Sequence, residues 1–414
     1  MRLAFEEIII NPLKPVMQGG YVQRDHHYET IHDDIKAVIY VLTLESGKMV
    51  WVTVDSVGLG RLFLDRLTRQ CSERGIELND DNFIIGVSHD HSSADMGMLI
   101  GDTDNSDPDY LDYLARILAE AIERCWKAEG IPVSPRYSSL IVDGIYSNRN
   151  DANKLSDKIV HMIGFFDQAD KMQALFCQLS CHNTVLGPRN YALTSELFGA
   201  LRDRLGSYFG CQVSMANGNS GDMGNRQYRT GQDFPDLELM ADNLAEQIER
   251  KHSKWQPFTM NHVSRRHVSY SEEVTFNSQQ WIDKINEFNE RLKHTDDLTE
   301  RKVLLSGIEG FRYKQSLGDG TRTIEMHADV YDFDELQIIS IPGELGSILG
   351  LRAKAASPKK FCILWGYTGN MTLGYMVDEE AYEMECQETN TTVYPKGMPE
   401  RFTDAIIKVI NKGE

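Results

Sequence analysis

The chain has 414 residues, of which 41% are hydrophobic and 25% are charged, so it can bury a large core and is typical of a globular protein. Its formal net charge of -19 at pH 7 argues against nucleic acid or an anionic membrane surface as a partner. No apolar stretch approaches the roughly eighteen residues that cross a bilayer, and the amino terminus carries acids where a signal peptide needs basic residues. We therefore expect no stable membrane insertion and a cytoplasmic location.

The seven cysteines are scattered, odd in number and without a CxxC pair. This usage is typical of reduced thiols in the cytosol and argues against a disulfide framework.

Short apolar runs that end in turn residues alternate with longer stretches of helical period, which is typical of a mixed α/β protein. Strands are expected over residues 37–44, 49–54, 82–87, 174–179, 336–341 and 360–365. Helices are expected over residues 60–74, 108–128, 194–205, 237–254, 279–293 and 399–411. We find no internal repeat in the sequence and predict a mixed β-sheet core flanked by helices.

The segment 252–320 is richer in charge than the rest and contains a polar helical pair over 277–305. We predict that it forms an insertion or a lid subdomain over the site.

A histidine pair follows the strand expected over 82–87, in the sequence His89-Asp90-His91. Residues i and i+2 of an extended chain project to the same side, so both imidazoles can face one point at the carboxyl end of the strand. With 12 histidines in the chain, one such spacing arises by chance roughly one time in three, so the strand context carries the prediction. The pair suits a metal ion or proton-transfer chemistry.

Two further strands end in possible metal ligands. His182 directly follows the strand 174–179, and Glu344 follows the strand 336–341 after Pro342-Gly343. Taken alone, His182 is more often a hydrogen-bonded core residue, and Glu344 could simply complement the dipole of the next helix. Because α/β sites form at the carboxyl ends of strands, the coincidence of these ends predicts a shared site there.

A glycine-rich loop around Asn217, Gly218 and Asn219 has too many small residues for the interior of a helix or strand. Such loops can turn backbone N–H groups toward a ligand, although they are also ordinary turns. We predict that these three residues bind substrate.

These segments, in this order, resemble the amino-terminal catalytic domain of the neutral, non-lysosomal ceramidase family. The resemblance covers most of the chain and makes residues 1–414 a single catalytic domain. Its motifs are Met17-Gln18-Gly19-Gly20-Tyr21, Trp51-Val52-Thr53-Val54-Asp55, the His89 and His182 segments, Asn148-Arg149, Gly221-Asp222, Pro342-Gly343-Glu344, Gly374-Tyr375 and Pro395-Lys396-Gly397.

The resemblance implies a zinc ion bound by His89, His182, Glu344 and Tyr375. It places a histidine that assists proton transfer at His91 and an arginine that contacts substrate at Arg149. Tyr375 could instead donate a hydrogen bond to the substrate.

Several positions depart from the family's pattern. Asp90 replaces a threonine, Ser93-Ala94 replaces Gly-Pro, Gly218 stands where many ceramidases carry a serine, and Gln387 replaces a second tyrosine. The carboxyl-terminal immunoglobulin-like domain of the long ceramidases is also missing from this sequence. We therefore expect a small soluble substrate rather than ceramide, and, because Gly218 has no nucleophile, hydrolysis without a covalent intermediate.

These features predict a zinc-dependent hydrolase that cleaves an amide by metal-activated water. Asp90 or Asp222 could orient a metal-bound histidine. The alternatives are hydrolysis of an ester, lactone or glycosidic bond on a polar metabolite, or a non-catalytic metal-binding member of the fold. Metallo-β-lactamases need Asp-His directly after His-x-His, and amidohydrolase barrels usually place the pair on their first strand, so this sequence favours both families less.

Overall fold

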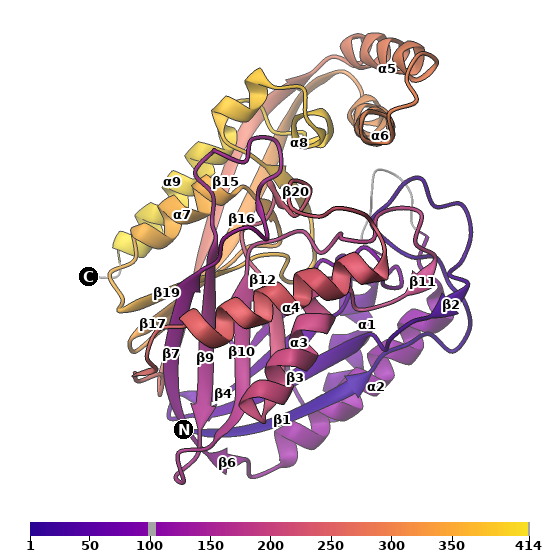
Figure 1. Cartoon of the computed structure of the whole chain (residues 1–414). Helices are drawn as coiled ribbons and strands as arrows, with labels where there is room; N and C mark the ends of the chain where they lie inside the picture. The colour runs from indigo at the N-terminus through magenta and orange to yellow at the C-terminus, as the bar shows by residue number, and fades with distance from the viewer. Residues whose placement is uncertain (98–104, 413–414) are drawn as a thin grey trace.

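Three β-sheets form the centre of the protein, and helices pack on their outer faces (Figure 1). The structure is a computed structural model and describes residues 1–97 and 105–412. It confirms the mixed α/β class and the sheet core flanked by helices.

The same order of elements, three strands, a helix, a strand and a helix, occurs three times along the chain. The first unit comprises β1 (Arg2–Ile9), β3 (Lys36–Leu44), β4 (Gly47–Val54), α1 (Arg61–Ser72), β5 (Phe83–Val87) and α2 (Pro108–Lys127). The second comprises β7 (Ser134–Ile141), β9 (Ile159–Phe166), β10 (Met172–Leu179), α3 (Glu196–Phe209), β12 (Gln212–Asn217) and α4 (Phe234–Lys251). The third comprises β15 (Val263–Phe276), β16 (Gly320–Phe333), β17 (Leu336–Ser340), α7 (Ser347–Ala355), β19 (Phe361–Trp365) and α9 (Met398–Asn411).

The strand pairing is also the same in the three units. The first three strands of each unit run antiparallel to their neighbours, and the fourth runs parallel to the third across a helical crossover. The three units therefore repeat the same order and pairing of strands and helices. The sequence does not reveal this repeat, because the units do not share a pattern of residues. Two short strands, β6 (Ile131–Pro132) and β14 (Gln256–Pro257), extend the first two sheets at one edge.

The three sheets pack against one another through a single apolar core. Alternate residues of each strand face this core, while the intervening ones face the helices, as the two-residue period of a strand requires. Trp51 of the first sheet contacts Phe165 and Phe176 of the second and Phe333 and Trp365 of the third. Each helix pair closes a separate outer core: α1 and α2 on the first sheet, α3 and α4 on the second, and α7 and α9 on the third.

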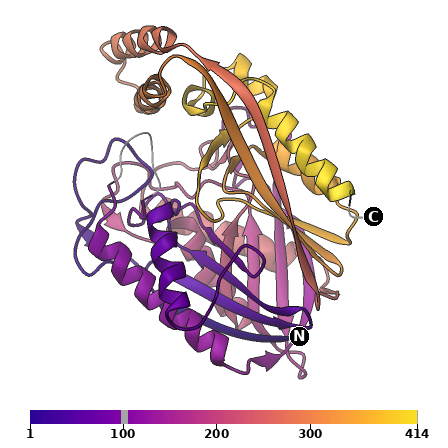
Figure 2. The same ribbon diagram turned by 180° about the vertical axis from the view of Figure 1, so that it is seen from behind.

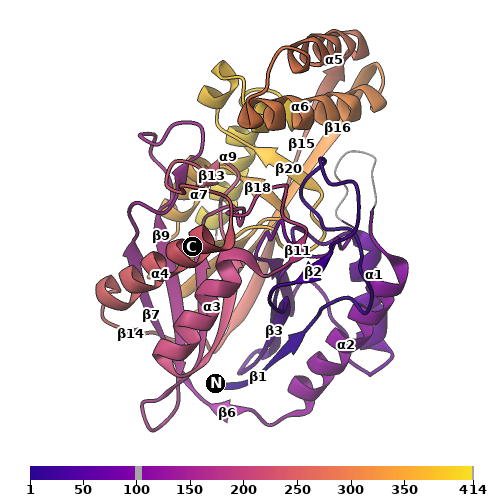
Figure 3. The same cartoon turned by 45° about the vertical axis from the view of Figure 1, so that its right-hand side comes forward.

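The helical pair α5 (Ser278–Leu292) and α6 (Leu298–Ser316) joins the far ends of the long strands β15 and β16. Figures 2 and 3 show this pair held away from the sheets, above the loops that follow the other strands. Of the segment 252–320 that we expected to be an insertion, the strand β15 belongs to the third sheet, and α5 and α6 form the added part.

Short paired strands tie the loops together at the same end of the molecule. They are β2 (Thr30–Ile31) with β11 (Ala192–Leu193), β8 (Ser147–Asn148) with β13 (Met223–Gly224), and β18 (Gly343–Leu345) with β20 (Leu373–Met376). A 3-10 helix (Glu379–Glu383) and α8 (Gln387–Thr391) follow β20.

All six predicted strands and all six predicted helices are confirmed, with ends that differ by a few residues. The seven cysteines are free thiols in the structure, and burial raises the pKa of Cys71 and Cys177 to about 12. Over the described ranges, no helix is long and apolar enough to cross a bilayer.

Candidate metal centre

The three units each send one or more polar side chains to a common point. His89 and His91 follow β5 of the first unit, and His182 follows β10 of the second. Glu344 lies on β18 and Tyr375 on β20, which both belong to the third unit and pair with each other at these two residues. The predicted convergence of strand ends is therefore what the structure shows.

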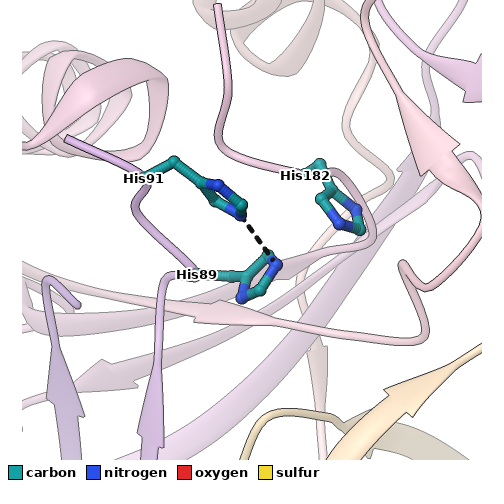
Figure 4. Close-up of side chains that lie close together, drawn as sticks. All are labelled: His89, His91 and His182. Atoms are coloured by element: carbon teal, nitrogen blue, oxygen red, sulfur yellow. Dashed lines mark hydrogen bonds between the residues drawn. The ribbon is translucent and has the colours of Figure 1, made fainter. Parts of the chain in front are cut away.

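The three histidines lie close together and are buried (Figure 4). Their ring nitrogens lie within 4.8 Å of one another, so this cluster could hold a metal ion. The Nε2 atoms of His91 and His89 are 3.1 Å apart, and the rings of His89 and His182 lie at right angles with centroids 4.6 Å apart.

Backbone carbonyls fix the orientation of two of these rings. Nδ1 of His89 donates to the carbonyl of Val57 at 2.6 Å, and Nδ1 of His182 donates to the carbonyl of Ser220 at 2.8 Å. A carbonyl oxygen can only accept, so the proton of each neutral ring sits on Nδ1 and the lone pair on Nε2 faces the centre. This is the arrangement that metal-binding histidines usually show.

His91 differs from the other two histidines. Its Nδ1 is buried and has no hydrogen-bond partner among the described residues. The sequence suggested that Asp90 or Asp222 would orient a histidine, and this was wrong. Asp90 accepts from the backbone N–H of Ser92 instead.

Glu344 completes the cluster. Its Oε2 atom lies 3.5 Å from Nε2 of His89 and 3.3 Å from Nε2 of His182, and it is buried without a hydrogen-bond partner in the described chain. The hydroxyl of Tyr375 is 3.3 Å from Nε2 of His182. Ligand atoms around a tetrahedral ion with bonds of about 2.0–2.1 Å lie about 3.4 Å apart, so these residues fit a small cation such as zinc.

Burial controls the charge of these groups. It lowers the pKa of His89 to about 3 and holds the pKa of His182 and His91 well below the ordinary value, so the imidazoles are neutral. Burial also raises the pKa of Glu344 to about 8, which the nearby Arg149 opposes in part. Glu344 lies in a strand rather than at the helix start that we expected, so a cation at the centre is what would keep it ionised at neutral pH.

Tyr367 is part of the same cluster, and the sequence analysis missed it. Its ring lies 4.2 Å from that of His89, and its hydroxyl shares a 2.7 Å hydrogen bond with Ser220 Oγ. Tyr367 and His89 have φ angles of 55° and 56°, which are uncommon for residues other than glycine. Two such strained residues in contact are typical of a functional site. The only signal in the sequence was the position of Tyr367 two residues after the end of a predicted strand, behind Gly366.

Arg149 lies beside the cluster. Its Nε donates to Glu388, its guanidinium lies 5.4 Å from the centre of the Tyr375 ring, and its Nη2 is buried without a partner among the described residues. The short pair of β8 and β13 holds it in place, because its backbone N–H donates to the carbonyl of Asp222.

The glycine-rich loop does not face the cavity, contrary to our prediction of a substrate-binding role for Asn217, Gly218 and Asn219. All three are buried, and none lines the cavity described below. Asn217 Nδ2 donates to the carbonyls of Ser88 and Cys181, which joins the ends of β5 and β10. The loop acts on the centre through Ser220, whose carbonyl orients His182.

A cavity of about 780 Å³ opens over the cluster, and His89, His91, Glu344 and Tyr375 form part of its lining. Its walls come from the start of α1, the loop before β20 and one face of α6, which includes Tyr313. Its volume is within the range of small-molecule sites.

Asp222 titrates at an unusual pH, which gives a testable prediction. Burial raises its pKa from 3.8 to about 6, although Ser347 and Asn148 donate to it. Because the folded pKa is the higher one, its contribution to stability is full below the unfolded pKa and is lost as pH rises through about 6. Urea unfolding should show that Asp222→Asn gains on the order of 3 kcal/mol relative to wild type between about pH 4 and 6.5. Parallel pH profiles for the two proteins would contradict this.

Searches for similar proteins found matches among solved structures. No family model and no curated protein matches the chain. The neutral ceramidase from Pseudomonas aeruginosa superposes with a TM-score of 0.75 and 14% sequence identity over 99% of this chain and 74% of that one. A ceramidase in complex with C2 gives a TM-score of 0.74 and 13% identity with the same coverage. The chain therefore has the fold of the neutral ceramidases.

Proposed function

We propose that the protein is a zinc-dependent hydrolase that cleaves an amide bond of a small soluble substrate. His89, His182 and Glu344 are the proposed metal ligands, with Tyr375 as a fourth ligand or a donor to the substrate. The proposal depends on the position of Glu344 Oε2, which lies 3.5 Å from Nε2 of His89 and 3.3 Å from Nε2 of His182. Both Nε2 atoms face the centre because the Nδ1 atom of each ring donates to a backbone carbonyl. A buried carboxylate oxygen aimed at two ring lone pairs is repulsive unless a proton or a cation lies between them.

His91 is assigned proton transfer rather than metal binding. Unlike His89 and His182, its Nδ1 has no partner among the described residues, and its Nε2 carries the proton, which it donates to the lone pair on Nε2 of His89. Its Nε2 faces the cluster and its ring lines the cavity, so it lies within reach of a leaving group bound there.

The other residues bind and orient the amide. His89, His182 and Glu344 would hold the zinc ion, which would supply Lewis acidity and an activated water. Arg149 and Tyr375 present hydrogen-bond donors on the side where the carbonyl oxygen gains negative charge, and their burial keeps those donors strong. His91 then delivers a proton to the departing amine nitrogen.

The shape of the cavity favours an amide with an apolar part. Its lining combines the polar cluster with the apolar side chains of Val22, Leu62, Met371 and Leu373. We propose that α5 and α6 act as a cover, since α6 forms one wall and limits the entry of water.

Metal analysis combined with substrate profiling tests the proposal. Dialysed protein should retain about one zinc per chain and hydrolyse short N-acyl amides faster than matched esters, lactones or glycosides. His91→Ala should keep the zinc and lose hydrolysis by about a hundredfold or more. Loss of zinc in His91→Ala would make His91 a ligand, and wild-type protein without zinc or turnover would favour a non-catalytic role.

A further inference from the structure

A basic cluster lies next to His91, and of its members the chemistry above uses only Arg149. It consists of Lys302 on α6, Arg226 after β13, and the free Nη2 of Arg149. The chain has a net charge of -19, and these three residues are not among those that line the cavity but adjoin His91, which does.

Lys302 belongs to the face of α6 that covers the cavity. It precedes Ser306 by four residues and Glu309 by seven, and both of these line the cavity, so the three share one side of the helix. The ammonium of Lys302 lies 4.8 Å from the centre of the Tyr21 ring, and that ring lies 4.9 Å from the ring of His91. Lys302 is thus one aromatic ring away from the residue assigned to proton transfer.

Arg226 and Arg149 leave the same β8–β13 pair. Asn148 pairs with Met223 in this short ladder, Arg149 follows one strand directly, and Arg226 follows the other after Asn225. Burial holds the pKa of Lys302 well below its ordinary value, the positive charges of Arg149, Arg226 and Arg229 lower it further, and Glu388 opposes them in part, which agrees with the closeness of these groups.

These donors lack acceptors. In the part of the chain that the structure describes, neither Lys302 nor Arg226 has a carboxylate or carbonyl within hydrogen-bond distance. Arg149 is 93% buried by side-chain area, yet its Nη2 has no partner, and the buried hydroxyl of Tyr21 and Nδ2 of Asn225 have none either. The neighbouring carboxylate, Glu388, is already bound to Arg149 and Asn150.

The three buried groups, Nη2 of Arg149, the Tyr21 hydroxyl and Nδ2 of Asn225, are costly unless a ligand supplies acceptors, and the half-buried Lys302 and Arg226 add positive charge near them. We propose that this cluster binds an anionic group of the substrate, so that the substrate is an amide with a carboxylate on its amine half. This rests on the proposed function, because His91 marks the side of the leaving amine. The cluster adjoins His91, whereas the apolar side chains of Val22, Leu62, Met371 and Leu373 line the cavity itself, so the acyl half occupies the cavity.

Binding to metal-free protein tests the inference apart from catalysis. The probes are N-octanoylglycine, the neutral N-octanoylglycinamide and N-octanoyl-O-phosphoethanolamine, measured by titration calorimetry after the metal has been removed with a chelator. We expect the glycine compound to bind about tenfold or more tightly than the glycinamide. Tighter binding of the phosphate compound would identify a phosphate ester as the anion source, and equal binding of the charged and neutral probes would overturn the inference.

Two variants and two controls assign the effect to the cluster. Lys302→Met and Arg226→Gln should each reduce the preference for the charged probe by about tenfold. Lys408→Met and Arg69→Gln remove exposed charges on α9 and α1 and should leave it unchanged. An undiminished preference in both cluster variants would overturn the inference. Failure of the proposed function would instead appear as absent hydrolysis, which leaves this binding result intact.

Discussion

Replacing His182 with alanine is expected to abolish zinc binding and to lower kcat/KM on an N-acyl amide by on the order of a thousandfold or more. The residue supplies one of the three proposed ligands, and its Nε2 lies 3.3 Å from both Glu344 Oε2 and the Tyr375 hydroxyl. Zinc content after dialysis and steady-state kinetics measure the two effects on the same preparation.

His27→Ala is the matched control, because His27 is an exposed histidine away from the centre. It should retain full zinc content and activity. If His182→Ala kept both, the proposed ligand set would be wrong.

Trp51→Ala is expected to destabilise the protein by about 3–5 kcal/mol, with the loss measured by urea unfolding. Trp51 is 1% exposed and is the side chain on which all three sheets meet. Its ring contacts Phe165 and Phe176 of one neighbouring sheet and Phe333 and Trp365 of the other. Since the ligands come from three different units, the same change should also weaken zinc binding.

Trp126→Ala removes the same side chain from a half-buried position on α2 and should cost clearly less. If the two variants lowered the free energy of unfolding equally, packing between the sheets would not be the main contribution to stability.

The residues of the site come from all three units, so the site forms only when the three sheets pack together. The first unit supplies His89 and His91, the second supplies His182, and the third supplies Glu344 and Tyr375. No unit holds more than two of these groups, so the centre forms only when the sheets meet. Backbone carbonyls of Val57 and Ser220 then orient the rings, which makes the local loop structure part of the site.

The local sequence determined the elements that have strong periodicity and clear ends. The strand that runs into His89 and the strand that runs into His182 were predicted closely, because apolar β-branched runs end there in polar turns. For the same reason the sequence located His89, His91, His182 and Glu344 at strand ends.

Only the tertiary structure decided which neighbours complete the site. The long strands β15 and β16 were not predicted, because neither contains a continuous run of apolar residues. They form because they pair with each other along their whole length, although they are far apart in the sequence. Lys302 and Arg226 lie far apart in the sequence, and no local pattern marks them. The positive charge of Arg226 reaches Lys302 only because the whole fold places α6 on the side of the molecule where the loop after β13 lies.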